Sequence, residues 1–195
     1  MNQPQREIRR VAVFCGSNTG LGDKYEQAAA ALGSALARRG IGIVYGGTHK
    51  GLMGILADAA LAGGGHVHGV INQRLFDKGH LHPGLTRHEV VESMRVRKER
   101  MLSVADACIA LPGGIGTLEE FMEAWTLNQL GELDKPVGLY NVGGFHEPFM
   151  GFIDRMIEEK FLPPEHRKGI VLEAEPDALI DALAAFEKPI VPKWL

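Results

Sequence analysis

Three glycine-rich turns, each directly following a short apolar run, constrain the fold of this chain more than any other feature. The runs with their turns are IRRVAVFCGSNTG, IGIVYGGTHKGLMG and ACIALPGGIGT, which begin at residues 8, 41 and 107. Stretches of helical periodicity, rich in alanine and leucine, lie between such runs, and several of them end at a glycine. Strands that alternate with helices in this way predict a parallel sheet covered on both faces.

We therefore expect an α/β fold, with residues 1–195 forming a single Rossmann-like domain built on a doubly wound parallel sheet. The length of 195 residues suits one domain, and no repeat or linker divides the chain. The expected strands are 8–16, 41–47, 66–71, 86–93, 107–114, 135–142 and 169–174. The expected helices are 23–39, 51–65, 94–104, 117–130, 146–159 and 177–186, and residues 72–85 are expected to form a long irregular loop.

Both ends of the chain are expected to lie outside this framework. Residues 1–7 are polar and predict a flexible N-terminus without the apolar core of a signal peptide. Residues 187–195 form a C-terminal tail, in which Trp194 is exposed unless it packs on the domain or on a partner subunit.

Composition excludes several classes of partner. A net charge of -3 gives no general reason to bind nucleic acid or an anionic membrane surface, and no apolar run is long enough to span a membrane. Cys15 and Cys108 are far apart and form no C-x-x-C pair, which argues against a disulfide framework or a zinc ribbon. We expect a cytoplasmic protein.

The glycine-rich turns also predict a binding site. In doubly wound sheets, ligands lie outside the carboxyl ends of the strands, and exposed backbone N–H groups at a helix N-terminus favour phosphate. Three such turns at one edge indicate a nucleotide or another phosphate ester. None of them matches G-x-G-x-x-G or G-x-x-x-x-G-K-[ST], so neither a dinucleotide cofactor nor a Walker-type triphosphate site is indicated.

The helix expected over 94–104 carries charge where it should be apolar. Met94, Met101 and Ala105 share one stripe, yet Arg97 lies within that stripe and Lys98 beside it. One interpretation is that the stems lie on the apolar surface while the charged heads reach water. The other is that this edge borders a polar cavity that requires positive charge.

The helix expected after GGIGT has an inward face of Leu118, Phe121, Met122 and Trp125, at i, i+3, i+4 and i+7. Three glutamates lie off that stripe: Glu119, Glu120 and Glu123. Acidic residues near a helix N-terminus also complement the helix dipole, so they do not by themselves indicate catalysis.

Two further patterns have ordinary explanations beside functional ones. Several histidines cluster around the third strand and the long loop, and they leave a metal site open, although no spacing matches a standard one: His66, His68, His80, His82 and His88. The run RVRKER contains a glutamate in a chain of acidic balance, so it suits a solvated helix edge or an active site better than a nucleic-acid contact.

Taken together, SMRVRKERM (93–101) and PGGIGTLEE (112–120) resemble the M-x-x-R-K and P-G-G-x-G-T-x-x-E motifs of the Lonely guy family of cytokinin-activating phosphoribohydrolases. The stretches YGGTHKGLMG, LNQLG and DKPVGLYNVGGF are also similar to that family. The resemblance runs from about Val11 to the C-terminal helix.

The resemblance implies a Rossmann-like fold in a homodimer, or in some relatives a hexamer, with no metal or redox cofactor. It implies hydrolysis of the N-glycosidic bond of N6-modified adenosine 5′-monophosphates, giving the free base and ribose 5-phosphate. Many relatives are labelled lysine decarboxylase, but nothing independent here indicates a pyridoxal phosphate site, which needs a Schiff-base lysine.

The resemblance and the glycine-rich turns together give the expected site. The implied catalytic pair is Arg97 and Glu120. The expected substrate-binding residues are Ser17, Gly46, Gly47, Met94, Lys98, Gly113, Gly114, Ile115, Gly116, Thr117, Leu118, Glu119 and Thr126.

This chain departs from the family pattern at several positions. Thr48 and His49 follow Gly-Gly where relatives often have a third glycine, Arg95 replaces a common histidine, and Asn72 replaces a common proline. An acidic substrate contact of plant members aligns near Gly79. These changes leave open a general AMP nucleosidase as well as a cytokinin-preferring enzyme, and a third alternative is a non-catalytic nucleotide-binding protein on the same fold.

Glycosidic chemistry explains why a phosphate site and carboxylates belong together. Cleavage builds positive charge on the ribose ring, so a turn that fixes the 5′-phosphate and a carboxylate that stabilises the cation or orients a water act in one site. We expect Glu120 to hold the ribose hydroxyls or the attacking water. Arginine does not give up its proton in proteins, so we expect Arg97 to bind phosphate or the departing purine and to orient Glu120.

Overall fold

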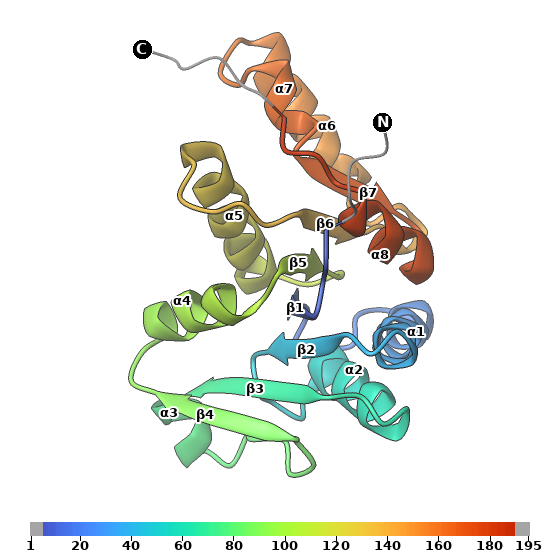
Figure 1. Cartoon of the computed structure of the whole chain (residues 1–195), viewed down its shortest axis with the longest axis vertical. Coiled ribbons are helices and arrows are strands. Elements are labelled where there is room, and N and C mark those ends of the chain that lie inside the picture. Colours follow the sequence, from blue (N-terminus) through green and yellow to red (C-terminus); the bar gives the residue numbers. More distant parts are fainter. Residues whose placement is uncertain (1–5, 190–195) are drawn as a thin grey trace.

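Strand β1 (Arg10–Phe14) is the central strand of a parallel sheet in the computed structural model, which describes residues 6–189. Within these residues the sheet has seven strands in the order β4-β3-β2-β1-β5-β6-β7 (Figure 1). Val11 pairs with Ile43 of β2 on one side and with Ala107 of β5 on the other. The order of strands therefore reverses between β1 and β5, which makes their carboxyl ends a topological switch point.

The other six strands are short and largely buried, as parallel strands covered on two faces must be. They are β2 (Gly42–Tyr45), β3 (Val67–Asn72), β4 (Arg87–Val91), β5 (Ala107–Ala110), β6 (Val137–Tyr140) and β7 (Ile170–Glu173). Each lies inside the range that the sequence predicts or, for β3, extends one residue beyond it.

Helices cover both faces of the sheet because side chains alternate along each strand. Val11 and Val13 pack in a core with α1 (Lys24–Arg38), α2 (Gly51–Ala62) and α8 (Pro176–Ala184). Ala12 and Phe14 point the other way, into a core with α4 (Met94–Val104), α5 (Ile115–Leu130) and α6 (Glu147–Glu158). Figure 1 shows α1, α2 and α8 on one side of the strands, with α4 and α5 on the other. The predicted doubly wound α/β fold is confirmed.

The segment expected to be an irregular loop contains a short helix, α3 (Gln73–Asp77). Asn72 caps it, since its side-chain oxygen accepts a hydrogen bond of 2.9 Å from the backbone N–H of Leu75. The loop is further tied to the turn after β2 by an isolated bridge between Thr48 and Leu81. The prediction of 72–85 as wholly irregular was therefore wrong, because five helical residues are too few to show a periodicity.

Two other short elements were not predicted, the 3₁₀ turn η1 (Val142–Gly144) and helix α7 (Pro164–Arg167). Near the N-terminus, the backbone N–H of Arg6 donates to the carbonyl oxygen of Ala184, at 2.9 Å. Residues 1–5 of the expected flexible N-terminus, and residues 190–195 of the expected tail with Trp194, lie outside the described residues. Within residues 6–189, no helix has the length and apolar character needed to cross a membrane.

Candidate active site

A cavity of about 250 Å³ lies at the carboxyl ends of β1 and β5, at the switch point of the sheet. Residues of all three glycine-rich turns line it, together with the first turns of α4 and α5. The lining residues are Val13, Phe14, Cys15, Gly16, Ser17, Gly46, Met53, Met94, Arg97, Gly114, Ile115, Gly116, Thr117, Glu119 and Glu120. The structure thus brings together turns that are up to one hundred residues apart in the sequence, at the edge where the strand pattern placed them.

The N-terminus of α5 forms one wall and is open to the cavity. Its N-cap, Gly114, has no side chain with which to bond the first-turn N–H groups, and the first helical hydrogen bond runs from the N–H of Leu118 to the carbonyl of Gly114, at 3.1 Å. A side chain at Gly113 would overlap the hydroxyl of Thr117, so glycine is required for this tight turn. The result is a set of backbone donors at the positive end of a helix dipole, which suits an anion.

Arg97 is the cation of this cavity, and it is buried, with 7% of its surface exposed. Its Nε donates to the carbonyl oxygen of Val70 in β3, at 3.0 Å, so the guanidinium is fixed to the sheet. A side chain at Gly46 would overlap this guanidinium. Arg97 therefore does not reach past the apolar surface into bulk water, and the interpretation of a polar cavity holds for this residue.

Glu120 faces Arg97 across the cavity. Its Oε1 lies 3.4 Å from Nη1 of Arg97, and the Glu120 side chain is 11% exposed. Burial raises the pKa of Glu120 above that of an ordinary glutamate, and the positive charge of Arg97 offsets part of this rise. The apolar stripe of α5 predicted that Glu120 lies off the inward face. This was misleading, because α5 has a second buried face, which is polar and is directed toward α4. Conversely Leu118, expected inward, is partly exposed.

Lys98 is engaged with other glutamates of α5. It forms ion pairs with Glu119 and with Glu123, the latter at 3.0 Å. Burial alone would lower the pKa of Lys98, but its hydrogen bonds to these two carboxylates raise it overall. Lys98 is absent from the residues that line the cavity, so its charge acts there through Glu119.

The remaining predicted residues divide into two groups. Ser17 and Met94 line the cavity, although Met94 was expected to face the core and is 44% exposed. Gly47, Leu118 and Thr126 do not line it. Gly47 adopts a φ of +74° and lies against the backbone of Gly69, and Thr126 is exposed on a later turn of α5. Substrate contacts by these three residues, as by the residues that line the cavity, stay predictions.

Sequence reasoning missed Cys15, which follows β1 directly and lines the cavity beside Glu120. Its position at the carboxyl end of the central strand was the signal that could have found it. Burial, reinforced by the charge of Glu120, raises the pKa of the Cys15 thiol, so it is no candidate for a thiolate nucleophile. Both cysteines are free, as expected.

A second cavity, of about 200 Å³, adjoins the first and shares Gly16, Ser17 and Gly114 with it. It extends to Tyr25 of α1 and Phe145, whose rings meet edge to face with centroids 5.8 Å apart. No local pattern in the sequence indicates this aromatic pair, because its members are distant in the chain. The two cavities together offer an anion-binding wall, a buried ion pair and an aromatic compartment.

The alternatives of a metal site and a nucleic-acid surface gain no support. Within residues 6–189, no group of three or more His, Cys, Asp or Glu side chains is placed to hold a metal ion. In the run RVRKER, Arg95 pairs with Glu99 at 3.8 Å on the exposed face, and Arg100 pairs with Glu89 at 2.7 Å. These two cations therefore already have carboxylate partners.

Comparisons with known proteins show the family of this chain. A family model described as "Possible lysine decarboxylase" matches residues 53–183, a range that contains both Arg97 and Glu120. The chain is 43% identical over 192 residues to a probable cytokinin riboside 5′-monophosphate phosphoribohydrolase of Oryza sativa subsp. japonica, covering 97% of this chain and 77% of that protein. The chain belongs to the Lonely guy family. A cytokinin riboside 5′-monophosphate phosphoribohydrolase of Arabidopsis thaliana is 41% identical to it over 187 residues, which is 96% of this chain and 86% of the relative.

Solved structures share the fold of this Lonely guy protein at much lower identity. The molybdenum cofactor binding protein from Rippkaea orientalis has a TM-score of 0.68 and 19% identity, covering 90% of this chain and 94% of that one. The molybdenum cofactor carrier protein from Chlamydomonas reinhardtii has a TM-score of 0.67 and 19% identity, covering 90% and 96%. At this distance the likeness concerns the fold alone.

Proposed function

We propose that this protein hydrolyses the N-glycosidic bond of adenosine 5′-monophosphates, including N6-modified ones, and releases the free base and ribose 5-phosphate. Relatives at 41% and 46% identity are named cytokinin riboside 5′-monophosphate phosphoribohydrolases. The observation that carries the proposal is the buried Arg97–Glu120 pair in the cavity whose wall is the open N-terminus of α5.

In this proposal the 5′-phosphate binds the backbone N–H groups at Ile115, Gly116 and Thr117. These groups precede the first hydrogen bond of α5, and no side chain of Gly114 or Gly116 obstructs them. Binding there fixes the ribose with its anomeric carbon toward Glu120. Because the phosphate is bound before and after the reaction, its contacts orient the sugar and do not take part in bond cleavage.

Glu120 acts on the water and on the ribose cation. As the bond from C1′ to the base nitrogen breaks, the ring gains positive charge, which a buried carboxylate stabilises strongly. Glu120 also accepts a proton from the attacking water, whose oxygen bonds to C1′. The base leaves with the electron pair of the broken bond and takes up one proton, so the elements of one water are divided between ribose and base. General-base action of this kind contributes ~10²–10⁴-fold to the rate.

Arg97 holds Glu120 in its ionised form and in position. The guanidinium is itself held by Val70, so little reorganisation is needed when charge develops. Lys98 neutralises Glu119 and Glu123, which limits the repulsion that these carboxylates exert on Glu120 and on a bound phosphate.

A direct assay separates this function from its alternatives. The purified protein is incubated in EDTA with AMP, with N6-isopentenyladenosine 5′-monophosphate and with the two nucleosides, and free base is measured by chromatography. We expect base from the monophosphates only, with Glu120→Gln inactive and Glu123→Gln active. Equal rates on both monophosphates would indicate a general AMP nucleosidase. Binding of AMP by calorimetry without any base release would overturn the enzyme and favour a nucleotide-binding protein.

We propose further that the protein is a cytoplasmic homodimer. Three apolar side chains are exposed around the mouth of the cavity, Met94, Ile115 and Leu118, as on a surface that a second subunit covers. The two free cysteines suit a reducing compartment. Light scattering coupled to size exclusion distinguishes the dimer from a monomer or a hexamer.

A further inference from the structure

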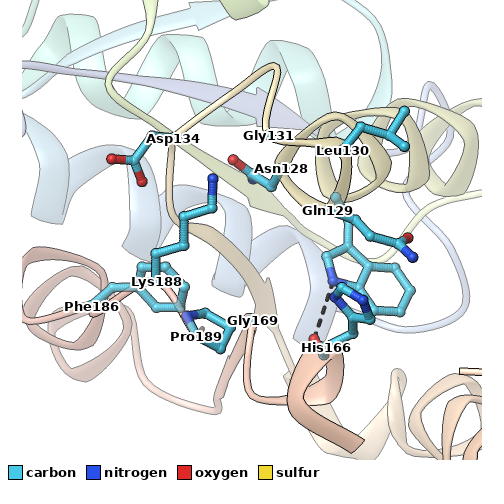
Figure 2. Close-up of a pocket in the computed structure, with 11 residues that line it drawn as sticks. Asn128, Gln129, Leu130, Gly131, Asp134, His166, Gly169, Phe186, Lys188 and Pro189 are labelled. Atoms are coloured by element: carbon cyan, nitrogen blue, oxygen red, sulfur yellow. Dashed lines mark hydrogen bonds between the residues drawn. The ribbon is translucent and has the colours of Figure 1, made fainter. Parts of the chain in front are cut away.

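A cavity of about 370 Å³ lies at the C-terminal end of α5, away from the proposed active site (Figure 2). Trp125 and His166 form one wall, where Nε1 of Trp125 donates to the carbonyl oxygen of His166 at 3.3 Å, and Phe186 lies across from them. This cavity shares no described residue with the active-site cavity. The smaller cavity of about 200 Å³ that contains Tyr25 and Phe145 does share such residues, so it can receive part of a substrate. We call it the aromatic cavity.

The aromatic cavity and the active-site cavity meet at the N-terminus of α5. Both are lined by Gly114, the N-cap, and by Gly16 and Ser17 of the first glycine-rich turn. A side-chain carbon added at Gly114 would meet no atom within 4 Å, so the junction is open at this point. Glu120 lies six residues further along α5, which is about 9 Å of helical rise. The aromatic cavity thus opens beside the proposed phosphate site, on the side away from Glu120.

The two rings of the aromatic cavity are held by the backbone around them. Gly20 has a φ of +81°, and a side chain there would overlap the Tyr25 ring. The turn that carries Phe145 is fixed by Asn141, whose Oδ1 accepts a hydrogen bond of 2.9 Å from the backbone N–H of His146. The Tyr25 and Phe145 rings then meet edge to face, with centroids 5.8 Å apart. Phe145 is 39% exposed, so its ring presents apolar surface for a ligand.

The lining of the aromatic cavity is uncharged among the described residues. It consists of four glycines and of seven neutral side chains, Ser17, Asn18, Thr19, Tyr25, Leu52, Pro112 and Phe145. Nζ of Lys24 lies 4.8 Å from the centroid of the Tyr25 ring, but Lys24 does not line the cavity. A second phosphate group placed here would lack a compensating cation, and partial burial of an unpaired anion is costly. The cavity therefore favours an uncharged group, and its rings favour an aromatic one.

We infer that the aromatic cavity binds an uncharged aromatic group esterified to the 5′-phosphate, so that the protein accepts 5′-phosphodiesters of adenosine as well as the monophosphate. The inference rests on the proposed function, which places the phosphate at the N-terminus of α5 and the ribose toward Glu120. In a diester, one phosphate oxygen bonds to the ribose and another to the aromatic group, so the two substituents extend from the phosphate into the two cavities.

The reaction of such a diester is the one already proposed. The bond from C1′ to the base nitrogen breaks, the oxygen of water bonds to C1′, and the base takes up one proton. Both ester bonds of the phosphate stay intact. The products are therefore the free base and an ester of ribose 5-phosphate.

Adenine release from AMP, from its methyl phosphodiester and from its phenyl phosphodiester tests the inference. The methyl ester reports the loss of one phosphate charge, and the phenyl ester differs from it by the aromatic ring. We expect KM for the phenyl ester to be roughly 5–20-fold below KM for the methyl ester, because the ring loses contact with water and packs against Phe145. We expect adenine and the phenyl ester of ribose 5-phosphate as products, without free phenol.

A pair of phenylalanine variants locates the effect. Phe145→Ala should remove most of the difference between the two esters by raising KM for the phenyl ester, while the methyl ester shows that the variant is folded. Phe152→Ala is the matched control, because it removes a ring that is 60% exposed on α6 and lines neither cavity. The difference between the esters should persist in this control.

The outcomes separate the inference from the proposed function. Equal KM values for the two esters, or cleavage of AMP without cleavage of the phenyl ester, would overturn the inference and leave the proposed function in place. If AMP itself is not cleaved, the proposed function fails, and calorimetry of the two esters then tests the aromatic cavity alone. Tighter binding of the phenyl ester that is lost in Phe145→Ala would support the cavity as its binding site, and equal dissociation constants would exclude it.

Discussion

Nη1 of Arg97 lies 3.4 Å from Oε1 of Glu120, and each side chain is about nine-tenths buried. The two residues come from separate motifs on α4 and α5, and the sheet brings them together at its switch point. A carboxylate so far from water requires a compensating charge, and an unpaired Arg97 would be equally costly. The burial of each charged side chain therefore depends on the presence of the other, which explains why the two motifs occur as a pair.

The pH dependence of the reaction follows from this relationship. The proposed mechanism needs ionised Glu120, whose pKa is raised by burial, so kcat/KM falls as the pH decreases through a value above the ~4.3 of an ordinary glutamate. Arg97→Gln removes the positive charge that opposes the rise in the pKa of Glu120. The acid limb of the plot of kcat/KM against pH then moves to higher pH. Arg95→Gln, at an exposed position of the same helix, leaves the limb in place. A limb at the same pH in Arg97→Gln and the unmodified protein would contradict this account.

Gly46 makes room for the Arg97 guanidinium, and this gives a second prediction. Gly46→Ala places a methyl group where the guanidinium lies, so Arg97 must leave its position between Val70 and Glu120. We expect kcat/KM to fall by about 10²-fold or more, as for other losses of a preorganised charge. The same substitution at Gly151 on α6, where a methyl group meets open space, serves as the control and keeps full activity. Full activity in Gly46→Ala would show that the position of Arg97 is unimportant.

The proposed phosphate site at α5 is tested by charge at its first turn. Ile115 is 89% exposed in the single chain, so substitution does not disturb the core, and the Asn variant below also lacks the apolar side chain of the proposed dimer surface. Ile115→Asp adds a negative charge beside the bound phosphate, and we expect KM for the monophosphate to rise roughly 5–30-fold, from about 1–2 kcal/mol of repulsion. Ile115→Asn has nearly the same shape without the charge and should change KM little. Equal KM values for the two variants would mean that the phosphate binds elsewhere.

The fold was predictable because its signals are local and repeated. Runs such as VAVFC and GIVY, followed by glycine and then a helical pattern, specify strand, turn and helix without knowledge of the rest of the chain. Once the sheet is parallel, the turns must share one edge. Arg97 was also accessible to sequence reasoning, since a cation within an apolar stripe is anomalous in any helix.

The rest of the site depends on how helices that are distant in the sequence pack together. Hydrophobic periodicity does not predict this packing. Glu120 is buried beside Arg97 of α4, so a stripe defined by apolar residues missed its environment. Lys98 of α4 forms ion pairs with Glu119 and Glu123 of α5 because the two helices bring these side chains together. Asn72 was noted as a departure from the family, and only the structure shows it as the cap of α3.

Glu89 in β4 ties α4 to the sheet. Its carboxylate accepts hydrogen bonds from Arg100 of α4, at 2.7 and 2.9 Å, and from Arg87, at 2.8 Å, and it lies 3.1 Å from Nε2 of buried His68. The hydrogen bonds from Arg100 are the main reason that the pKa of Glu89 is lowered to about 2. Arg100 is one turn after Arg97, so this contact helps to anchor the helix that carries the proposed catalytic cation.

A pH-dependent loss of stability follows. Because the pKa of Glu89 is lower in the folded protein than the ~4.3 of an unfolded chain, its stabilisation is present above that value and is lost as the pH falls toward 2. At pH 7 we expect Glu89→Gln to lower the free energy of unfolding by about 1–2 kcal/mol after solvent screening. Urea unfolding between pH 7 and pH 2 measures this, and the difference from the unmodified protein should stay constant down to about pH 4.3 and then shrink toward pH 2. Glu92→Gln, at an exposed neighbouring position, should unfold like the unmodified protein at every pH. A difference that is constant from pH 7 to pH 2 would show that Glu89 stabilises by packing and not by charge.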